Sequence, residues 1–264
     1  MTRTVYGKWL RDSRRSLLAW TLAIVVVGSA YAAFWPTFED PEIAKLLDSY
    51  PKALLEAINY TNITTPEGYL TATVYGLVVA VLTAIFAIGA GARLVAGDEE
   101  AGTLDLVLAH PVSRPSLALQ RMAALATAVV AVVTVFWVAM VVLSGPADFS
   151  SIPVANLAAM HLHLAAFALL FGSLSFAVGA ATGHRSWALG AGAGAAVLAY
   201  AASGLLPQLG GLEWTRDWSA FTWLTGSMPL AHGVDLGHLA TMLGTSVVLV
   251  ALGTLAFRRR DVAV

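Results

Sequence analysis

Six long apolar stretches constrain this chain more than any other feature of its sequence. They cover residues 17–35, 69–92, 117–143, 154–181, 187–206 and 239–257. Each approaches or exceeds the roughly 20 residues that an α-helix needs to cross a bilayer. Arg121 is the only Asp, Glu, Lys or Arg within them. The sequence therefore predicts an all-α polytopic membrane protein with six transmembrane helices, forming one domain over residues 1–264.

Composition supports the same class of protein. Hydrophobic residues make up 58% of the chain and charged residues 12%, whereas soluble domains carry about 25% charged residues. The net charge of −1 leaves no basic face for nucleic acid. Cysteine is absent, which excludes disulfides, thiolate metal sites and cysteine nucleophiles.

The distribution of Lys and Arg predicts the orientation in the membrane, because cytoplasmic loops are enriched in these residues. One set of loops and termini carries Arg3, Lys8, Arg11, Arg14, Arg15, Arg93, Arg114, Arg121, Arg185, Arg258, Arg259 and Arg260. The opposite set carries only Lys45, Lys52 and Arg216. We therefore expect a multi-pass protein of the cell membrane, with both termini and the loop between spans 2 and 3 in the cytoplasm.

Two outer loops are long enough to hold structure of their own. In the loop 37–68, apolar residues recur at near-helical spacing over 43–58 and Pro51 interrupts them, so two short interfacial helices are expected. The loop 207–238 holds Trp214, Trp218, Phe221 and Trp223, which predicts aromatic anchoring at headgroup depth. A re-entrant or interfacial helical hairpin is expected before the last span.

The polar stretch 97–114 lies between the second and third spans. Gly102 is expected to end one helix, and Thr103 to cap a new short helix by accepting a backbone N–H. Leu104, Val107 and Leu108 would share one apolar face of that helix, and Pro111 would end it. Ser113 is placed to cap the third span, with Arg114 and Pro115 in its first turn. A generic surface helix remains an alternative.

This stretch resembles the signature of ABC-2 type permeases, the membrane subunits of ATP-binding-cassette exporters. The similarity spans Glu99-Glu100-x-Gly102-Thr103-Leu104-Asp105-Leu106-x-Leu108-x-x-Pro111-Val112-Ser113-Arg114. The aromatic, Pro-containing segment 218–233 and the tail 257–261 are similar as well, while Ala109-His110 departs from the pattern. The resemblance implies a cytoplasmic coupling helix at the ATPase interface. Its implied site residues are Glu99, Glu100, Gly102, Thr103, Leu104, Leu106, Leu108, Pro111 and Arg114.

The resemblance also implies partners. The chain lacks the phosphate-binding pattern G-x-x-x-x-G-K-[ST], so ATP and Mg²⁺ would be held by a separate ABC ATPase and this chain would not itself be an enzyme. A second permease half, identical or related, is implied. Only Arg121 is charged within the apolar stretches, which disfavours ion-coupled antiport and suits a hydrophobic or amphipathic cargo such as a drug, antibiotic or lipid.

Other features permit other functions. His161 and His163 lie two residues apart in the fourth span and would point in nearly opposite directions, which makes them a poor metal pair. Ser173 and Ser203 sit beside glycines, as in an intramembrane serine protease. A membrane scaffold that signals with an ATPase without transporting anything is a further alternative.

The motifs Gly179-x-x-x-Gly183 and Gly190-x-x-x-Gly194 permit close helix approach, and packing within one subunit is favoured over a dimer contact.

Overall fold

The structure is a computed structural model that describes residues 4–38, 49–51, 54–55, 63–109 and 111–260. The regular elements of these residues are all helices, and six segments are long and apolar enough to cross a membrane. The predicted fold class is therefore confirmed. The six spans are α1 (Val5–Ala32), α5–η1–α6 (Pro66–Tyr69, Leu70–Val78, Val79–Gly91), α9 (Arg114–Leu143), α10 (Val154–Thr182), α11 (Arg185–Gly204) and α14 (Leu236–Arg259).

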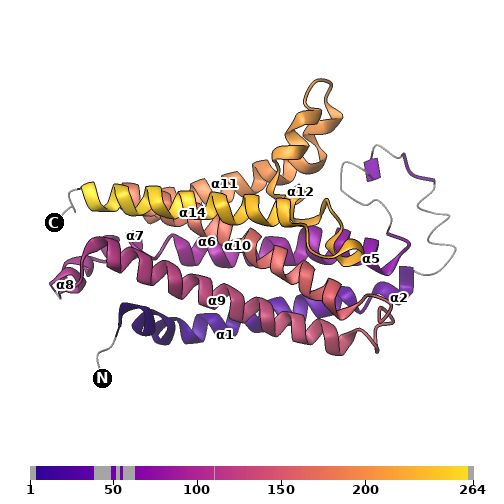
Figure 1. The fold of residues 1–264 in the computed structure, drawn as a ribbon, viewed down its shortest axis with the longest axis horizontal. Coiled ribbons are helices and arrows are strands. Elements are labelled where there is room, and N and C mark those ends of the chain that lie inside the picture. Colours follow the sequence, from indigo (N-terminus) through magenta and orange to yellow (C-terminus); the bar gives the residue numbers. More distant parts are fainter. Residues whose placement is uncertain (1–3, 39–48, 52–53, 56–62, 110, 261–264) are drawn as a thin grey trace.

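Helix α10 lies at the centre of the bundle. It packs against α6, α9, α11 and α14, while α1 lies along α9 on one side (Figure 1). In the most apolar stretch of α10, 72% of the residues are buried inside the protein, against 17% in the corresponding stretches of the spans that contain α1, α11 and α14. The last three helices therefore leave most of their apolar surface for lipid or for another chain.

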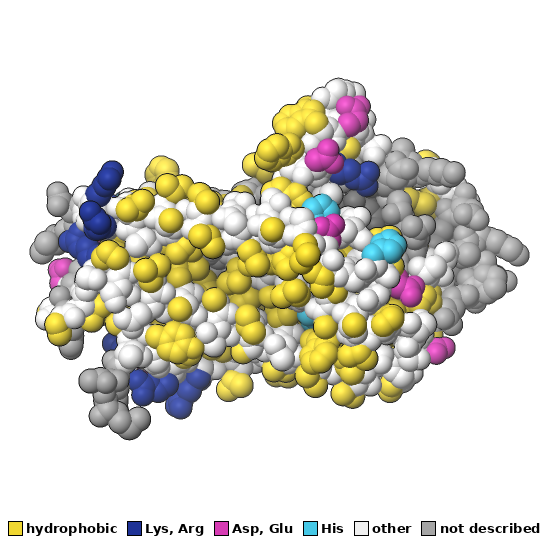
Figure 2. Space-filling view, viewed as in Figure 1, with side chains coloured by type: hydrophobic (Ala, Val, Ile, Leu, Met, Phe, Trp, Pro, Cys, Tyr) yellow, Lys and Arg dark blue, Asp and Glu magenta, His cyan; other side chains and the backbone are white. Residues whose placement is uncertain are grey.

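The bundle has two distinct ends. The start of α1, the end of α14 and the short helices α7 (Ala96–Glu100) and α8 (Leu104–Leu108) lie at one end, which we call the proximal end; α2 (Trp35–Phe38) and α5 lie at the other, the distal end (Figure 1). Lys and Arg side chains gather at the proximal end, and hydrophobic side chains cover the surface between the ends (Figure 2). This distribution matches a bundle that stands across a membrane.

The first span is longer than its apolar stretch. Helix α1 begins at Val5, twelve residues before the predicted start, because the Thr4 hydroxyl caps it by accepting from the Gly7 N–H at 3.2 Å. The Tyr6 hydroxyl donates to Thr127 Oγ1 of α9 at 3.0 Å and holds this extension against the bundle. The helix ends at Ala32 and not at Pro36, which lies within α2.

The second span contains a feature that the sequence does not predict. Residues Leu70–Val78 form a π-helix, η1, between α5 and α6. Its wider turns bond each N–H one residue further back than an α-helix does. A Cβ on Gly76 would lie 2.7 Å from the Thr71 carbonyl oxygen, so this position within the π-helix suits a residue without a side chain.

Close helix crossings use glycines, and only part of this was predicted correctly. Gly179 packs within the subunit, where a Cβ would lie 3.4 Å from Ala188 and Ala96. Gly190 and Gly194 differ, because no atom of the described residues lies within 4 Å of a Cβ built on either of them. The prediction that both motifs pack internally is therefore wrong for this second motif, which faces away from the subunit.

The segment between α11 and α14, which we call the distal segment, forms four short helices where the sequence predicted a helical hairpin. They are η2 (Leu206–Gln208), η3 (Glu213–Trp218), α12 (Ala220–Thr225) and α13 (Pro229–His232). Phe221 and Leu224 of α12 are buried against the bundle, whereas Trp214 and Trp218 of η3 are exposed. Most of the helices expected over 43–58 fall outside the described residues.

Candidate functional site

The segment between α6 and α9 turns twice at the proximal end. Helix α6 ends at Gly91, and α7 follows after a short turn. Gly102 then adopts a left-handed backbone conformation, with φ of +64°, before α8 begins. The Ser113 hydroxyl caps α9 by accepting from the Ser116 N–H at 3.4 Å, and Pro115 lies in the first turn. The predicted short helix between the second and third spans is therefore present, and we call 96–109 the coupling segment.

Thr103 does not cap α8 as predicted. Its backbone has helical angles, and its hydroxyl donates to the Asp98 carbonyl oxygen at 3.2 Å instead of accepting an N–H. The Thr103 N–H donates to the same oxygen at 2.8 Å. Gly102 produces this result, since its left-handed turn brings Thr103 back over the end of α7. Thr103 thus closes α7 and does not open α8.

Three consecutive acids of α7 contact three different spans. Asp98 forms an ion pair with Arg121 of α9, and Glu99 forms one with Arg260 at the end of α14. Glu100 Oε1 accepts from the Arg185 N–H at 2.8 Å. That N–H belongs to the first residue of α11, where a carboxylate satisfies an unpaired donor and the helix dipole.

The two ion pairs differ in their exposure. Arg121 keeps 8% of its side chain exposed and Asp98 33%; Glu99 keeps 8% and Arg260 21%. Arg121 also donates to the Leu94 carbonyl oxygen in the turn before α7. A guanidinium one turn inside an apolar span is costly unless it is paired. Asp98 and the turn that precedes α7 supply both of its partners.

Helix α8 presents a buried side and an exposed side. Leu104 is 2% exposed and packs into the core, whereas Leu106 is 68% exposed. Asp105 is exposed as well, and Val107 is half-buried against the core. The apolar face predicted for this helix is thus confirmed for Leu104 and Val107, while the side chain of Leu108 is not described.

The predicted site residues separate into two groups. Some point into the bundle or hold another helix: Glu99, Glu100, Leu104 and Arg114. Others are exposed on the proximal surface: Gly102, Thr103, Leu106 and Pro111. The sequence analysis did not place Asp98, Arg121, Arg185 or Arg260 in the site. Arg121 carried a signal, because a lone cation in an apolar span requires a partner.

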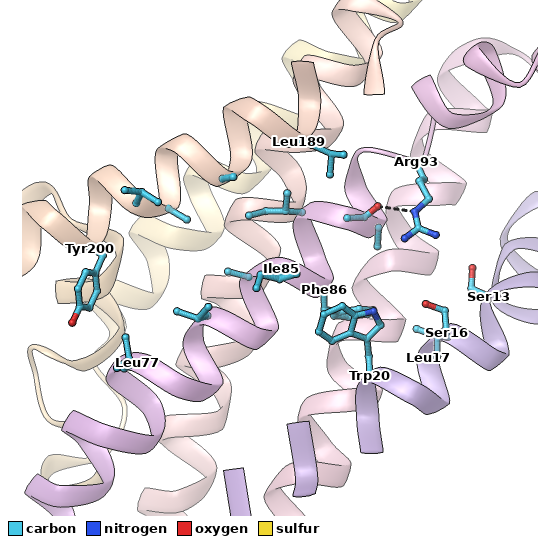
Figure 3. Close-up of a pocket in the computed structure, with 18 of the residues that line it drawn as sticks. Ser13, Ser16, Leu17, Trp20, Leu77, Ile85, Phe86, Arg93, Leu189 and Tyr200 are labelled. Carbon is cyan, nitrogen blue, oxygen red and sulfur yellow. Dashed lines mark hydrogen bonds between the residues drawn. The ribbon is translucent and has the colours of Figure 1, made fainter. Parts of the chain in front are cut away.

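A large apolar cavity of about 730 Å³ opens between α1, α6 and α11 (Figure 3). Trp20, Phe86 and Ile85 line its middle, with the Trp20 and Phe86 rings 6.0 Å apart. Arg93 lies at one end of the cavity and Tyr200 at the other (Figure 3). The cavity therefore has an apolar lining with polar groups near its ends, which is typical of sites for amphipathic small molecules.

Of the described residues, His161 and His163 are not arranged for catalysis with Ser173 or Ser203. His161 Nδ1 lies 2.7 Å from the Leu157 carbonyl oxygen, and its Nε2 lies 3.4 Å from the Tyr75 hydroxyl of the second span. His163 contacts the carbonyl oxygens of Ala159 and Asp235 through its two ring nitrogens. Each ring nitrogen already has a partner other than a serine, so neither histidine is placed to activate one.

Comparison with known proteins assigns the chain to a family over nearly its whole length. Residues 3–262 match the model of a family described as ABC-2 family transporter protein. A comparison with curated proteins gives no match.

Proposed function

Because the chain belongs to the ABC-2 family of transporter proteins, we propose that it is the permease subunit of an exporter that is driven by a separate ABC ATPase. The coupling segment carries this proposal. The three acids of α7 contact three spans, while Leu106 and Asp105 of α8 are exposed at the proximal surface. A partner that pushes on α8 would therefore move the bundle and not only a loop.

The proximal end is proposed to face the cytoplasm. Lys and Arg gather there (Figure 2), and cytoplasmic ends of membrane helices are enriched in these residues. Both termini and the coupling segment then meet the ATPase, in whose sites ATP and Mg²⁺ would be bound. The protein would be a multi-pass component of the cell membrane.

The ATPase contact is proposed to be made by the exposed group of site residues, Gly102, Thr103, Leu106 and Pro111. Glu99, Leu104 and Arg114, which point into the bundle, and Glu100, which contacts the start of α11, would hold the segment in position. A recess of about 350 Å³ adjoins α7, and its lining includes Arg93, Asp98, Glu100 and Arg185. It offers cations and carboxylates to side chains of the partner.

The cargo is proposed to be hydrophobic or amphipathic, such as a drug, an antibiotic or a lipid, and to enter the cavity between α1, α6 and α11. Apolar side chains make up most of the wall, and Asp12 and Arg93 are among its few charged residues. A bulky side chain at Ala193 would fill part of the cavity. Ala193→Trp should lower transport of a lipophilic dye, whereas Val247→Trp on exposed α14, outside the cavity, should not.

A second permease half is proposed to dock against α11. Gly190 and Gly194 lie one turn apart on this helix, and a Cβ added to either would meet no described atom of the subunit within 4 Å. Small residues at this spacing let two helices approach closely in lipid. The docked half would stand beside the cavity, to which the same helix contributes Leu189, Ala193, Ala196, Val197 and Tyr200.

In the proposed cycle, ATP binding closes the two ATPases and displaces α8. The coupling segment is covalently continuous with the second and third spans, so these spans would move with it. The two membrane halves would then alternate between inward and outward access to the cavity. The preference of ATP for the closed ATPase pair drives closure. Hydrolysis of that ATP in the partner lets the pair reopen and supplies the net free energy of the cycle.

The test compares two exposed leucines, one on α8 and one in the segment between α11 and α14. Leu106 is 68% exposed on α8, and Leu209 is 56% exposed in the distal segment. The chain is co-expressed with ABC ATPases of its own genome, beginning with any encoded beside it, and co-purification and ATP-dependent dye transport in vesicles are measured. Leu106→Arg should lose both and Leu209→Arg should keep both. Equal behaviour of the two variants would contradict the proposed interface.

A non-transporting scaffold that signals with an ATPase would share the same interface. Flux separates the two functions, because a scaffold binds the ATPase yet moves no dye across the membrane. The serine protease alternative makes a different prediction: Ser173→Ala or Ser203→Ala would abolish activity. For a permease, we expect both variants to retain transport.

A further inference from the structure

The end of the last span is held by a charged contact that the family resemblance does not predict. Arg260 follows α14 directly, and its guanidinium forms an ion pair with Glu99 of α7. Glu99 keeps only 8% of its side chain exposed. Opening the pair would leave this carboxylate largely desolvated without its partner, which is strongly unfavourable. The contact therefore resists separation of α14 from the coupling segment.

A second residue secures the same point from the third span. Arg114, at the start of α9, donates from Nη1 to the Arg260 carbonyl oxygen at 2.5 Å. Its guanidinium carbon also lies 5.8 Å from the centre of the Phe257 ring, within the range of a cation–π contact. Phe257 is fully buried. The last turn of α14 is thus attached both to α7, within the coupling segment, and to α9, which follows that segment in the chain.

The turn between α10 and α11 also lies against the Glu99–Arg260 ion pair. Gly183 has φ of +78°, and a Cβ there would lie 2.7 Å from Glu99 Oε1 and against Arg260. Only glycine lets this turn approach the ion pair so closely. Four elements therefore meet at one charged contact: α7, α9, α14 and the turn between α10 and α11.

From this geometry we propose that Glu99 and Arg260 are positioning residues that carry movement of the coupling segment to the last span. The pair stays closed throughout the transport cycle. The inference rests on the proposed function and extends it, since the chain connects the segment directly to the second and third spans but not to the sixth. Packing alone joins most of α14 to α10, and the Glu99–Arg260 contact adds a direct connection to the site on which the ATPase would act.

The experiment uses the full chain assembled with its ATPase in proteoliposomes. Bound ATPase, ATP hydrolysis and dye flux are measured, and flux per ATP hydrolysed is the readout. Arg260→Ala should bind ATPase normally and lower flux per ATP by about twofold to thirtyfold, the range of coupling effects from residues outside both sites. Arg259→Ala is the matched control, because it removes the same charge from the neighbouring exposed position.

Exchange of the two charges separates positioning from general damage. Glu99→Arg combined with Arg260→Glu should recover most of the flux per ATP that either single change loses. If Arg260→Ala does not assemble, Arg260→Gln takes its place, since glutamine keeps hydrogen-bond donors without the charge. Equal flux per ATP in the Arg260 and Arg259 variants would overturn the inference.

The absence of cysteine from the chain allows a direct test of whether the contact stays closed. Glu99→Cys with Arg260→Cys should lower flux per ATP, and joining the two thiols with a short bifunctional reagent should restore it. Loss of flux on joining would show that the contact must open, and would refute the rigid connection. The proposed function fails in a different way, when the wild-type chain itself neither binds ATPase nor moves dye.

Discussion

Arg121 shows what a single residue can reveal in a chain of this kind. A cation one turn inside an apolar span requires compensation, and the structure supplies Asp98 and the Leu94 carbonyl oxygen. The requirement could be predicted from the sequence, but the partner could not. Asp98 lies 23 positions away, and its direction depends on how α7 is turned by the segments before it.

At this scale the first prediction concerns that ion pair. Arg121→Leu should lower the free energy of unfolding by about 1–3 kcal/mol, less than for a fully buried pair because Asp98 is one-third exposed. Asp98→Ala in the same background should recover part of the loss, since no unpaired carboxylate remains. Denaturant titration in mixed micelles measures both. A loss in the double variant equal to the sum of the two single losses would contradict the pairing.

Two glycines with positive φ form a second, matched prediction. Gly102→Ala should cost about 1 kcal/mol, because only the left-handed backbone opposes it and no described atom lies within 4 Å of its Cβ. Gly183→Ala should cost more, by about a further 1–3 kcal/mol, since its Cβ would collide with Glu99 and Arg260. Thermal unfolding in detergent ranks the two. The reverse order would mean that the turn at Gly183 is not closely packed.

At the scale of elements, apolar length predicted the spans well and their ends less well. The lipid environment requires each spanning backbone to satisfy its own hydrogen bonds, so long apolar stretches become helices. The polar residues that flank a span lie outside the lipid and are free of that requirement. Local capping therefore decides where the helix begins or ends, and Thr4 sets the start of α1 in this way. The π-helix η1 could not be predicted, because its residues are as apolar as those of an ordinary span.

The crossing of α6 and α10 gives a prediction at this scale. A Cβ on Gly91 would collide with the backbone of Gly172, whereas the nearest neighbour of a Cβ on Gly89 is the tip of Arg93, at 3.9 Å. Gly91→Ala should push the helices apart and lower the free energy of unfolding by about 1–3 kcal/mol. Gly89→Ala, two residues away on the same helix, should be neutral or stabilising. Equal stability of the two variants would show that the crossing can relax.

At the scale of the whole molecule, the six-helix architecture and the location of the coupling segment could be predicted from the sequence. The arginines that contact the acids of α7 could not be predicted, because positions 121, 185 and 260 come together only through the packing of α9, α11 and α14. The outward direction of Gly190 and Gly194 was likewise decided by which face of α11 meets α10. A motif of small residues does not itself identify its partner.

The orientation of the molecule can be tested because the chain contains no cysteine. Single cysteines at Ala101, on the proximal surface, and at Gly210, in the exposed distal segment, provide the two probes. A membrane-impermeant maleimide should label Gly210→Cys in intact cells and Ala101→Cys only after the membrane is opened. The opposite labelling pattern would place the coupling segment outside the cell and exclude an ATPase contact.

Assembly of two halves gives the last prediction. Gly194→Ile should shift the equilibrium between dimer and monomer by about tenfold toward the monomer, because a side chain in a close helix contact costs about 1.4 kcal/mol or more. Gly244→Ile is the control, since a Cβ at Gly244 of α14 also meets no described atom within 4 Å. Cross-linking yield in native membranes measures the shift. Equal yields for both variants would place the second half elsewhere.

The three acids of α7 are consecutive in the chain, and successive residues of an α-helix point about 100° apart. Their spacing therefore assigns each acid to its own span. Substitution at one of these positions weakens one link, but insertion or deletion of a single residue would redirect all of the acids after it at once. In any set of related sequences we therefore expect the length of this segment to be kept, so that alignments across Asp98–Glu100 contain no gaps.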